Sequence, residues 1–84
     1  MRVTLKLYAT LTDYLPATAR RDNLVALDVD DGATIASVVA PFNLPPKLTH
    51  LVLVNGVFVP RGERGTHALR DGDVVAIWPP IAGG

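Results

Sequence analysis

The 84-residue sequence has no cysteine, no excess of either charge and no long hydrophobic run. Without cysteine, the chain can form no disulfide, no thiolate nucleophile and no cysteine-ligated zinc site. Eight Lys and Arg residues balance eight Asp and Glu residues, so no net charge draws the protein to nucleic acid or to an anionic membrane. The N-terminus lacks the apolar core of a signal peptide, and no apolar run could cross a bilayer. We therefore expect a cytoplasmic protein that binds neither nucleic acid nor membrane.

Residues suited to catalysis or metal binding are also scarce. The two histidines, His50 and His67, stand at no spacing typical of metal ligands, and Ser37 has no neighbouring base in the sequence. The acidic residues between positions 28 and 31 indicate a turn, and no glycine-rich stretch opens a helix as a phosphate-binding loop would. The sequence predicts no catalytic apparatus, no metal site and no bound cofactor.

Apolar residues make up 49% of the chain, and their periodicity predicts the secondary structure. Alternation of apolar and polar residues, or short apolar runs bounded by turn residues, predicts strands at residues 2–8, 24–29, 51–54, 57–59 and 73–78. Thr34 precedes apolar residues at helical spacing, which predicts a helix with Thr34 as its N-cap, and Pro41 limits that helix to about two turns. The segment 10–23 contains Pro16 and indicates a loop more than a helix. Leu51 to Val54 indicates a buried strand, and Asn55-Gly56 indicates a turn after it.

Two strands, one helix and then further strands predict a single α+β domain. The β-grasp, or ubiquitin-like, roll is the commonest small fold with this order of elements. It has a mixed sheet of four to five strands with one short helix on one face, and its first and last strands lie parallel at the sheet centre. We expect such a domain over residues 1–78, followed by a flexible C-terminal tail over residues 79–84.

The last residues of the chain, Trp78-Pro79-Pro80-Ile81-Ala82-Gly83-Gly84, follow the final predicted strand directly. Two prolines cannot donate to a sheet ladder, so the chain must leave the sheet in an extended path. The terminal glycines carry no side chain, so this end could enter a narrow cleft in another protein. The one chemically useful group there is the α-carboxylate of Gly84.

Three segments of the chain together resemble the small, sulfur-carrying subunit of molybdopterin synthase, a ubiquitin-like sulfur carrier. They are residues 54–56 (Val-Asn-Gly), 69–76 (Leu-Arg-Asp-Gly-Asp-Val-Val-Ala) and 78–84. Thiamine-type sulfur carriers share the fold and the Gly-Gly end but usually lack the Pro-Pro-x-Ala before it, so they rank second. The sequence departs from the pattern at Pro41, in its longer loop over residues 61–65, and at Trp78, where that family more often has Phe.

The resemblance implies a non-catalytic carrier that works inside a larger sulfur-transfer system. An activating enzyme of the ubiquitin type would use ATP to adenylate the carboxylate of Gly84, the residue after Gly83. A persulfide-bearing sulfurtransferase would then convert this carboxylate to a thiocarboxylate. The large subunit of molybdopterin synthase would then receive the sulfur for cyclic pyranopterin monophosphate. Two other functions stay open: a ubiquitin-like modifier joined through Gly84 to lysines, and an interaction module whose tail is idle.

The resemblance and the strand periodicity also predict a docking surface. Val75 and Ile77 fit the core face of the last strand, so strict alternation places Trp78 on the opposite face, where we expect it to be largely exposed. Tyr8 should lie close to Trp78, and Phe58 matches an apolar partner-contact position of the resembled family. The alternative, that all three aromatic residues belong to the core, stays open. The expected partner-binding residues are Tyr8, Phe58, Trp78, Pro79, Pro80, Ile81 and Ala82.

Overall fold

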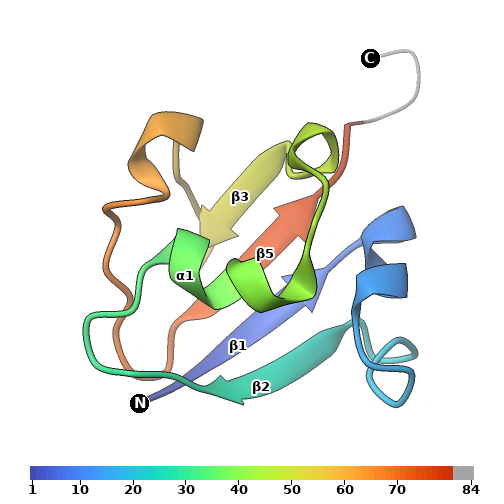
Figure 1. The fold of residues 1–84 in the computed structure, drawn as a ribbon, viewed down its shortest axis with the longest axis horizontal. Helices are drawn as coiled ribbons and strands as arrows, with labels where there is room; N and C mark the ends of the chain where they lie inside the picture. The colour runs from blue at the N-terminus through green and yellow to red at the C-terminus, as the bar shows by residue number, and fades with distance from the viewer. Residues whose placement is uncertain (81–84) are drawn as a thin grey trace.

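Five strands form one mixed sheet in the order β2-β1-β5-β3-β4 in the computed structural model, which describes residues 1–80 (Figure 1). The strands β1 and β5 are parallel, and every other neighbouring pair is antiparallel. This arrangement confirms the β-grasp fold, with the first and last strands side by side in the middle of the sheet. The strand bounds are β1 (Arg2–Leu7), β2 (Leu24–Asp28), β3 (Leu51–Val54), β4 (Val57–Phe58) and β5 (Val74–Trp78).

The one α-helix of the described residues, α1 (Ile35–Val39), is short and lies across one face of the sheet (Figure 1). Thr34 caps it as predicted: the Thr34 hydroxyl accepts a hydrogen bond from the Ser37 N–H, and the Ser37 hydroxyl accepts one from the Thr34 N–H. The chain continues into a 3₁₀ helix, η2 (Ala40–Phe42), which contains Pro41 and ends at Asn43 in the left-handed conformation. The predicted limit of about two turns is therefore confirmed, because proline cannot donate the next helical hydrogen bond.

The core lies between α1 and the face of the sheet that the helix covers, which we call the inner face. Alternate residues of the central strands point into it, among them Leu5, Val75 and Ile77, each at most 1% exposed. Ile35 and Val38 contribute from the helix. Burial of these aliphatic side chains is the main term that stabilises the fold.

The segment 10–23 is not a simple loop, which corrects the sequence-based expectation. It begins with the 3₁₀ helix η1 (Ala9–Tyr14), and Leu11 and Leu15 from this segment are buried at 0% and 2% exposure. These leucines cover the end of the core next to β1 and belong to the main core cluster. Two further 3₁₀ helices, η3 (Pro46–Leu48) and η4 (Arg61–Glu63), flank β3 and β4.

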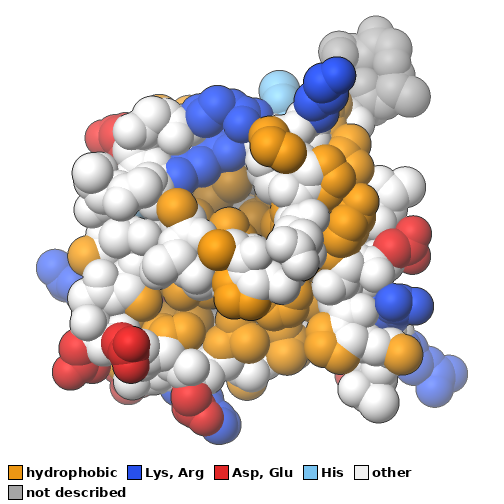
Figure 2. Space-filling view, in the orientation of Figure 1, with side chains coloured by type: hydrophobic (Ala, Val, Ile, Leu, Met, Phe, Trp, Pro, Cys, Tyr) orange, Lys and Arg blue, Asp and Glu red, His pale blue; other side chains and the backbone are white. Residues whose placement is uncertain are grey.

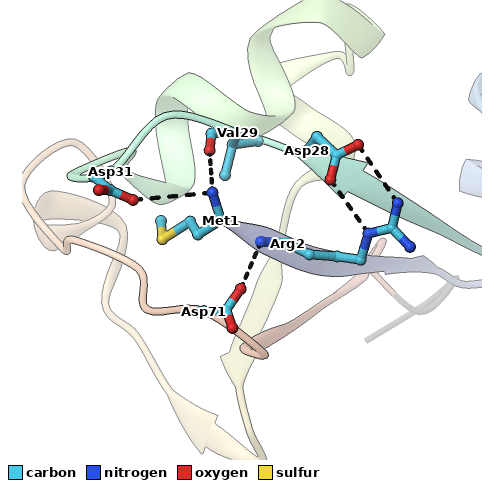
Figure 3. Close-up of polar contacts among 6 residues, drawn as sticks. All are labelled: Met1, Arg2, Asp28, Val29, Asp31 and Asp71. Carbon is cyan, nitrogen blue, oxygen red and sulfur yellow. Dashed lines mark hydrogen bonds and ion pairs between the residues drawn. The ribbon is translucent and has the colours of Figure 1, made fainter.

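The end of the sheet where β1 begins is held by polar contacts around Met1 and Arg2 (Figure 3). The amino group of Met1 donates to the Val29 carbonyl at 2.8 Å and lies 3.9 Å from the Asp31 carboxylate. The Arg2 guanidinium pairs with Asp28 at 3.3 Å and holds the pKa of that carboxyl below its ordinary value. The Arg2 N–H donates to the Asp71 carboxylate at 2.7 Å. These acidic residues therefore gather at the end of the sheet opposite Trp78.

Candidate functional site

The end of β5 is held by hydrogen bonds from both neighbouring segments. The Tyr8 N–H, just after β1, donates to the Ile77 carbonyl at 3.1 Å, and the His50 N–H, just before β3, donates to the Trp78 carbonyl at 3.2 Å. The chain is thus fixed to the sheet as far as Trp78, and Pro79 and Pro80 follow. The other predicted tail residues, Ile81, Ala82, Gly83 and Gly84, lie outside the described residues, so their roles stay predictions.

Tyr8 and Trp78 stack against each other at the base of the tail. Their ring centroids are 4.2 Å apart and their planes differ by 6°, which confirms the predicted proximity. The prediction that Trp78 is largely exposed is wrong, because the Tyr8 ring covers one of its faces and leaves it half-buried. Neither ring belongs to the inner-face core. The two rings instead form a stacked pair on the outer face of the sheet.

Phe58 lies on the edge strand β4 and is 54% exposed, so it is not a core aromatic residue. Its partner across the β3–β4 pair is Leu53, and the predicted turn at Asn55-Gly56 lies between the strands, with positive φ at both residues. A two-residue hairpin turn of this kind fixes the register and with it the face that Phe58 occupies. Its ring is therefore presented to solvent on the same face as Leu53.

The strand register extends this apolar surface beyond the three predicted aromatic residues. Leu51 lies opposite Trp78, and Leu53 lies between Phe58 and Ala76. The predicted burial of the whole run from Leu51 to Val54 is therefore wrong: only Val52 and Val54 face the core, whereas both leucines are half-buried on the outer face. We call Phe58, Leu53, Leu51, Trp78 and Tyr8 the outer apolar strip. The sequence signal for this wider surface was the strand Leu51–Val54, which is apolar on both of its faces.

The remaining polar candidates do not form a reactive site. The Ser37 hydroxyl is engaged in the cap of α1, and the two histidines lie apart, His50 before β3 and His67 in the loop before β5. Within residues 1–80, no three His, Asp or Glu side chains gather so that they could hold a metal ion. None of the helices in this part of the chain has the length and apolar character that spanning a membrane requires. The prominent features of these residues are an apolar surface on the outer face of the sheet and a hydrogen-bonded end of β5.

A β-grasp sheet with a central final strand and a glycine-ended extension defines a small ubiquitin-like protein. Residues 9–84 match the model of the ThiS family, and the chain belongs to this family. The predicted kinship with ubiquitin-like sulfur carriers is thereby confirmed. A search of curated protein sequences gave no significant match.

Solved structures share the fold over the whole chain. SAMP1 from Haloferax volcanii is 26% identical, with a TM-score of 0.69 and 100% of both chains covered. The HVO 2177 protein of the same organism is 28% identical, with a TM-score of 0.69, covering 100% of this chain and 87% of that one. A chain of the Helicobacter pylori 26695 molybdopterin-converting factor, solved as a complex of subunits 1 and 2, is 15% identical with a TM-score of 0.63 and full coverage of both chains. At 15% identity the likeness shows the fold alone.

Proposed function

We propose that this protein is a sulfur carrier whose C-terminal carboxylate, on Gly84, is activated and converted to a thiocarboxylate. The observation that carries the proposal is that the ThiS-family match runs through residue 84 and so includes Gly83 and Gly84. A carboxylate is a poor electrophile until it is activated. An adenylating partner that uses ATP supplies this activation, with pyrophosphate as the leaving group.

The sulfur then comes from a persulfide on a sulfurtransferase. Its terminal sulfur attacks the acyl adenylate and displaces AMP, and a second thiol cleaves the resulting acyl disulfide to leave the thiocarboxylate. The carrier provides only the acyl group and the surface by which its partners hold it. This division of labour agrees with the absence of cysteine from the chain. In this proposal the chain acts as a non-catalytic subunit.

We further propose that the sulfur is used in molybdopterin synthesis and that the large synthase subunit is the final partner. Two observations support this: the Pro-Pro-Ile-Ala segment before Gly83, and the fold shared with a factor that was solved as a two-subunit complex. In this proposal the outer apolar strip binds the partner while residues 79–84 enter its active site. Thiamine-type or other biosynthetic sulfur transfer is the alternative pathway.

A second candidate function is protein modification, because the chain is 26% identical to SAMP1 and shares its fold with the H. volcanii small archaeal modifier protein 1. A modifier shares the activation step and differs in the nucleophile, which is then a lysine amine of a target protein rather than a persulfide. The two candidates are therefore separated by the product and not by the fold.

Intact mass spectrometry tests both candidates on one preparation. The full chain is incubated with the activating enzyme, ATP and a persulfide donor, with a chain lacking Gly84 as the control. A carrier gains the mass difference between sulfur and oxygen, whereas a modifier yields lysine-linked species. If the full chain and the control both keep their original mass, the proposal is wrong and the tail is idle.

A further inference from the structure

Two arginines of the loop after β4 converge on one backbone segment. Arg61 Nη2 donates to the Thr49 carbonyl at 2.9 Å, and Arg64 Nη1 donates to the same oxygen at 2.8 Å. Arg64 Nη2 donates to the His50 carbonyl at 2.9 Å. Burial lowers the pKa of the Arg64 guanidinium from its ordinary value, and the neighbouring Arg61 charge lowers it further. Two like charges are thus held side by side.

No carboxylate of the described residues compensates this pair. The ion pairs found within residues 1–80 are Met1 with Asp31 and Arg2 with Asp28, both at the opposite end of the sheet (Figure 3). Glu63 lies between the two arginines in the chain, but it lines the separate pocket beside Phe58. The Arg64 Nε is buried and finds no hydrogen-bond partner among these residues. The chain is neutral overall, yet the end of the domain next to the tail is basic.

A cleft of about 260 Å³ lies beside the arginines on the inner-face side of the domain. Its floor is aliphatic, from Ile35, Val39, Val52 and Ile77, and Arg61 and Arg64 stand at its rim. Figure 2 shows this face of the molecule, with Lys and Arg side chains gathered towards its upper edge, beside a recess in which hydrophobic atoms are visible. The outer apolar strip is on the opposite face of the sheet.

We propose that this cleft is a second recognition site, which receives a glutamate side chain of a protein partner. The glutamate methylenes would lie against the aliphatic floor, and its carboxylate would accept hydrogen bonds from the two guanidinium groups. Charge-assisted bonds between Arg and carboxylate are among the strongest polar contacts in proteins. A free phosphate fits less well, because it has no apolar part to lie against the aliphatic floor.

The site lies within reach of any partner that holds the tail. Arg64 binds the His50 carbonyl, and the N–H of His50 binds the last residue of β5, Trp78. A partner on the outer apolar strip and a partner segment in this cleft would therefore grip the tail base from both faces of the sheet. The inference does not depend on whether Gly84 receives sulfur or a lysine.

A peptide titration followed by NMR tests the proposal on the full isotope-labelled chain. The probes are the acetylated and amidated tripeptide Leu-Glu-Leu, its Leu-Gln-Leu counterpart and inorganic phosphate. We expect the glutamate peptide to shift the backbone amides of Ala36 and Gly65 and the side-chain N–H signals of the arginines. The glutamine peptide should bind at least about tenfold more weakly, since it removes a hydrogen bond to a charged group.

Arg61→Gln should weaken binding of the glutamate peptide by a similar factor. The domain should stay folded, because Arg64 still donates a hydrogen bond to the Thr49 carbonyl. Arg21→Gln, an exposed arginine outside the cleft, is the matched control and should bind as the parent does. Equal binding of the two peptides would overturn the proposal. So would phosphate shifting the same signals at equal or lower concentration, or no shift with the glutamate peptide up to about 10 mM, which would leave the arginines as a structural clamp.

Discussion

Replacing Trp78 by alanine should lower both the stability of the domain and its affinity for partners. The half-buried indole covers about 100 Å² of apolar surface, worth ~2.5 kcal/mol at ~25 cal/mol per Å². Loss of the stack with Tyr8, whose centroid is 4.2 Å away, adds ~0.5–1.5 kcal/mol. Because area sums of this kind are upper bounds, we expect a total loss of ~2–3 kcal/mol. In a domain of this size the melting temperature should fall by roughly 10–20 °C.

A double-mutant cycle isolates the stacking contribution. Urea unfolding of Tyr8→Ala, Trp78→Ala and the double variant should give a coupling free energy of ~0.5–1.5 kcal/mol. The contact between the rings is the only term that the cycle retains if each single change removes it cleanly. Strictly additive losses would show that the parallel rings do not stabilise each other, and would refute this part of the reasoning.

Partner binding is measured on the same variants by titration calorimetry, at a temperature where each is folded. Trp78→Ala should weaken binding to the activating enzyme or to the large synthase subunit by roughly 30-fold or more, as for a central interface anchor. Phe58→Ala is the matched control for stability: because its ring is 54% exposed, it should lose affinity but less than ~1 kcal/mol of stability. If both variants bind as the parent does, the outer apolar strip is not the docking surface.

Three further predictions concern the tail and two turns. One alanine added after Gly84 displaces the carboxylate by ~3.3–3.6 Å and should abolish thiocarboxylate formation in the mass assay without changing the melting temperature; normal loading would contradict the carrier mechanism. The Asp73 carboxylate accepts hydrogen bonds from the Arg70 N–H and from Asn55 Nδ2, and the first of these chiefly holds its pKa below the ordinary value. The contribution of this carboxylate to stability is therefore complete above the unfolded pKa of ~3.9 and is lost as the pH falls through the lower folded pKa. In urea melts, Asp73→Ala should cost ~1 kcal/mol of stability at pH 7, after allowance for solvent screening, and less at about pH 2. An equal cost at both pH values would refute this. Gly56 has φ +83°, and no atom lies within 4 Å of the point that a Cβ would occupy. Gly56→Ala should therefore lower the stability only by the backbone strain of ~1–2 kcal/mol that an alanine meets at this φ. A larger loss by thermal melting would reveal a contact that the turn geometry does not predict.

The sheet could be predicted from the sequence because each of its strands has a strong local signal. Leu5 and Val75 alternate with polar or outward-facing neighbours, and period-two burial follows from the pleat itself. The cap of α1 was predictable for the same reason, since Thr34 and Ser37 satisfy each other within one helical turn. Local rules determined these elements, and the tertiary structure agreed with them.

The errors arose where burial depends on residues far away in the chain. Alternation gave the correct face of Trp78, but its exposure depends on Tyr8 at the other end of the sequence. Leu11 is buried from the 3₁₀ helix η1 and Leu15 from the residue that follows it, and a 3₁₀ helix has neither the period of a strand nor that of an α-helix. The convergence of Arg61 and Arg64 on the carbonyls before β3 follows from the path of two loops, and no pattern in the sequence encodes it.

The parallel pairing of β1 and β5 determines how the domain resists mechanical force. Met1 precedes β1 and the tail follows β5, so a pull on the tail against a held N-terminus acts along both strands in opposite senses. Such a pull loads all the hydrogen bonds between the two strands together, whereas a hairpin pulled at its open end loses them one after another. When the N-terminus is held, a partner that pulls on the tail therefore cannot peel β5 away in small steps. The partner would have to break the hydrogen bonds between β1 and β5 together, so the folded domain transmits the tension.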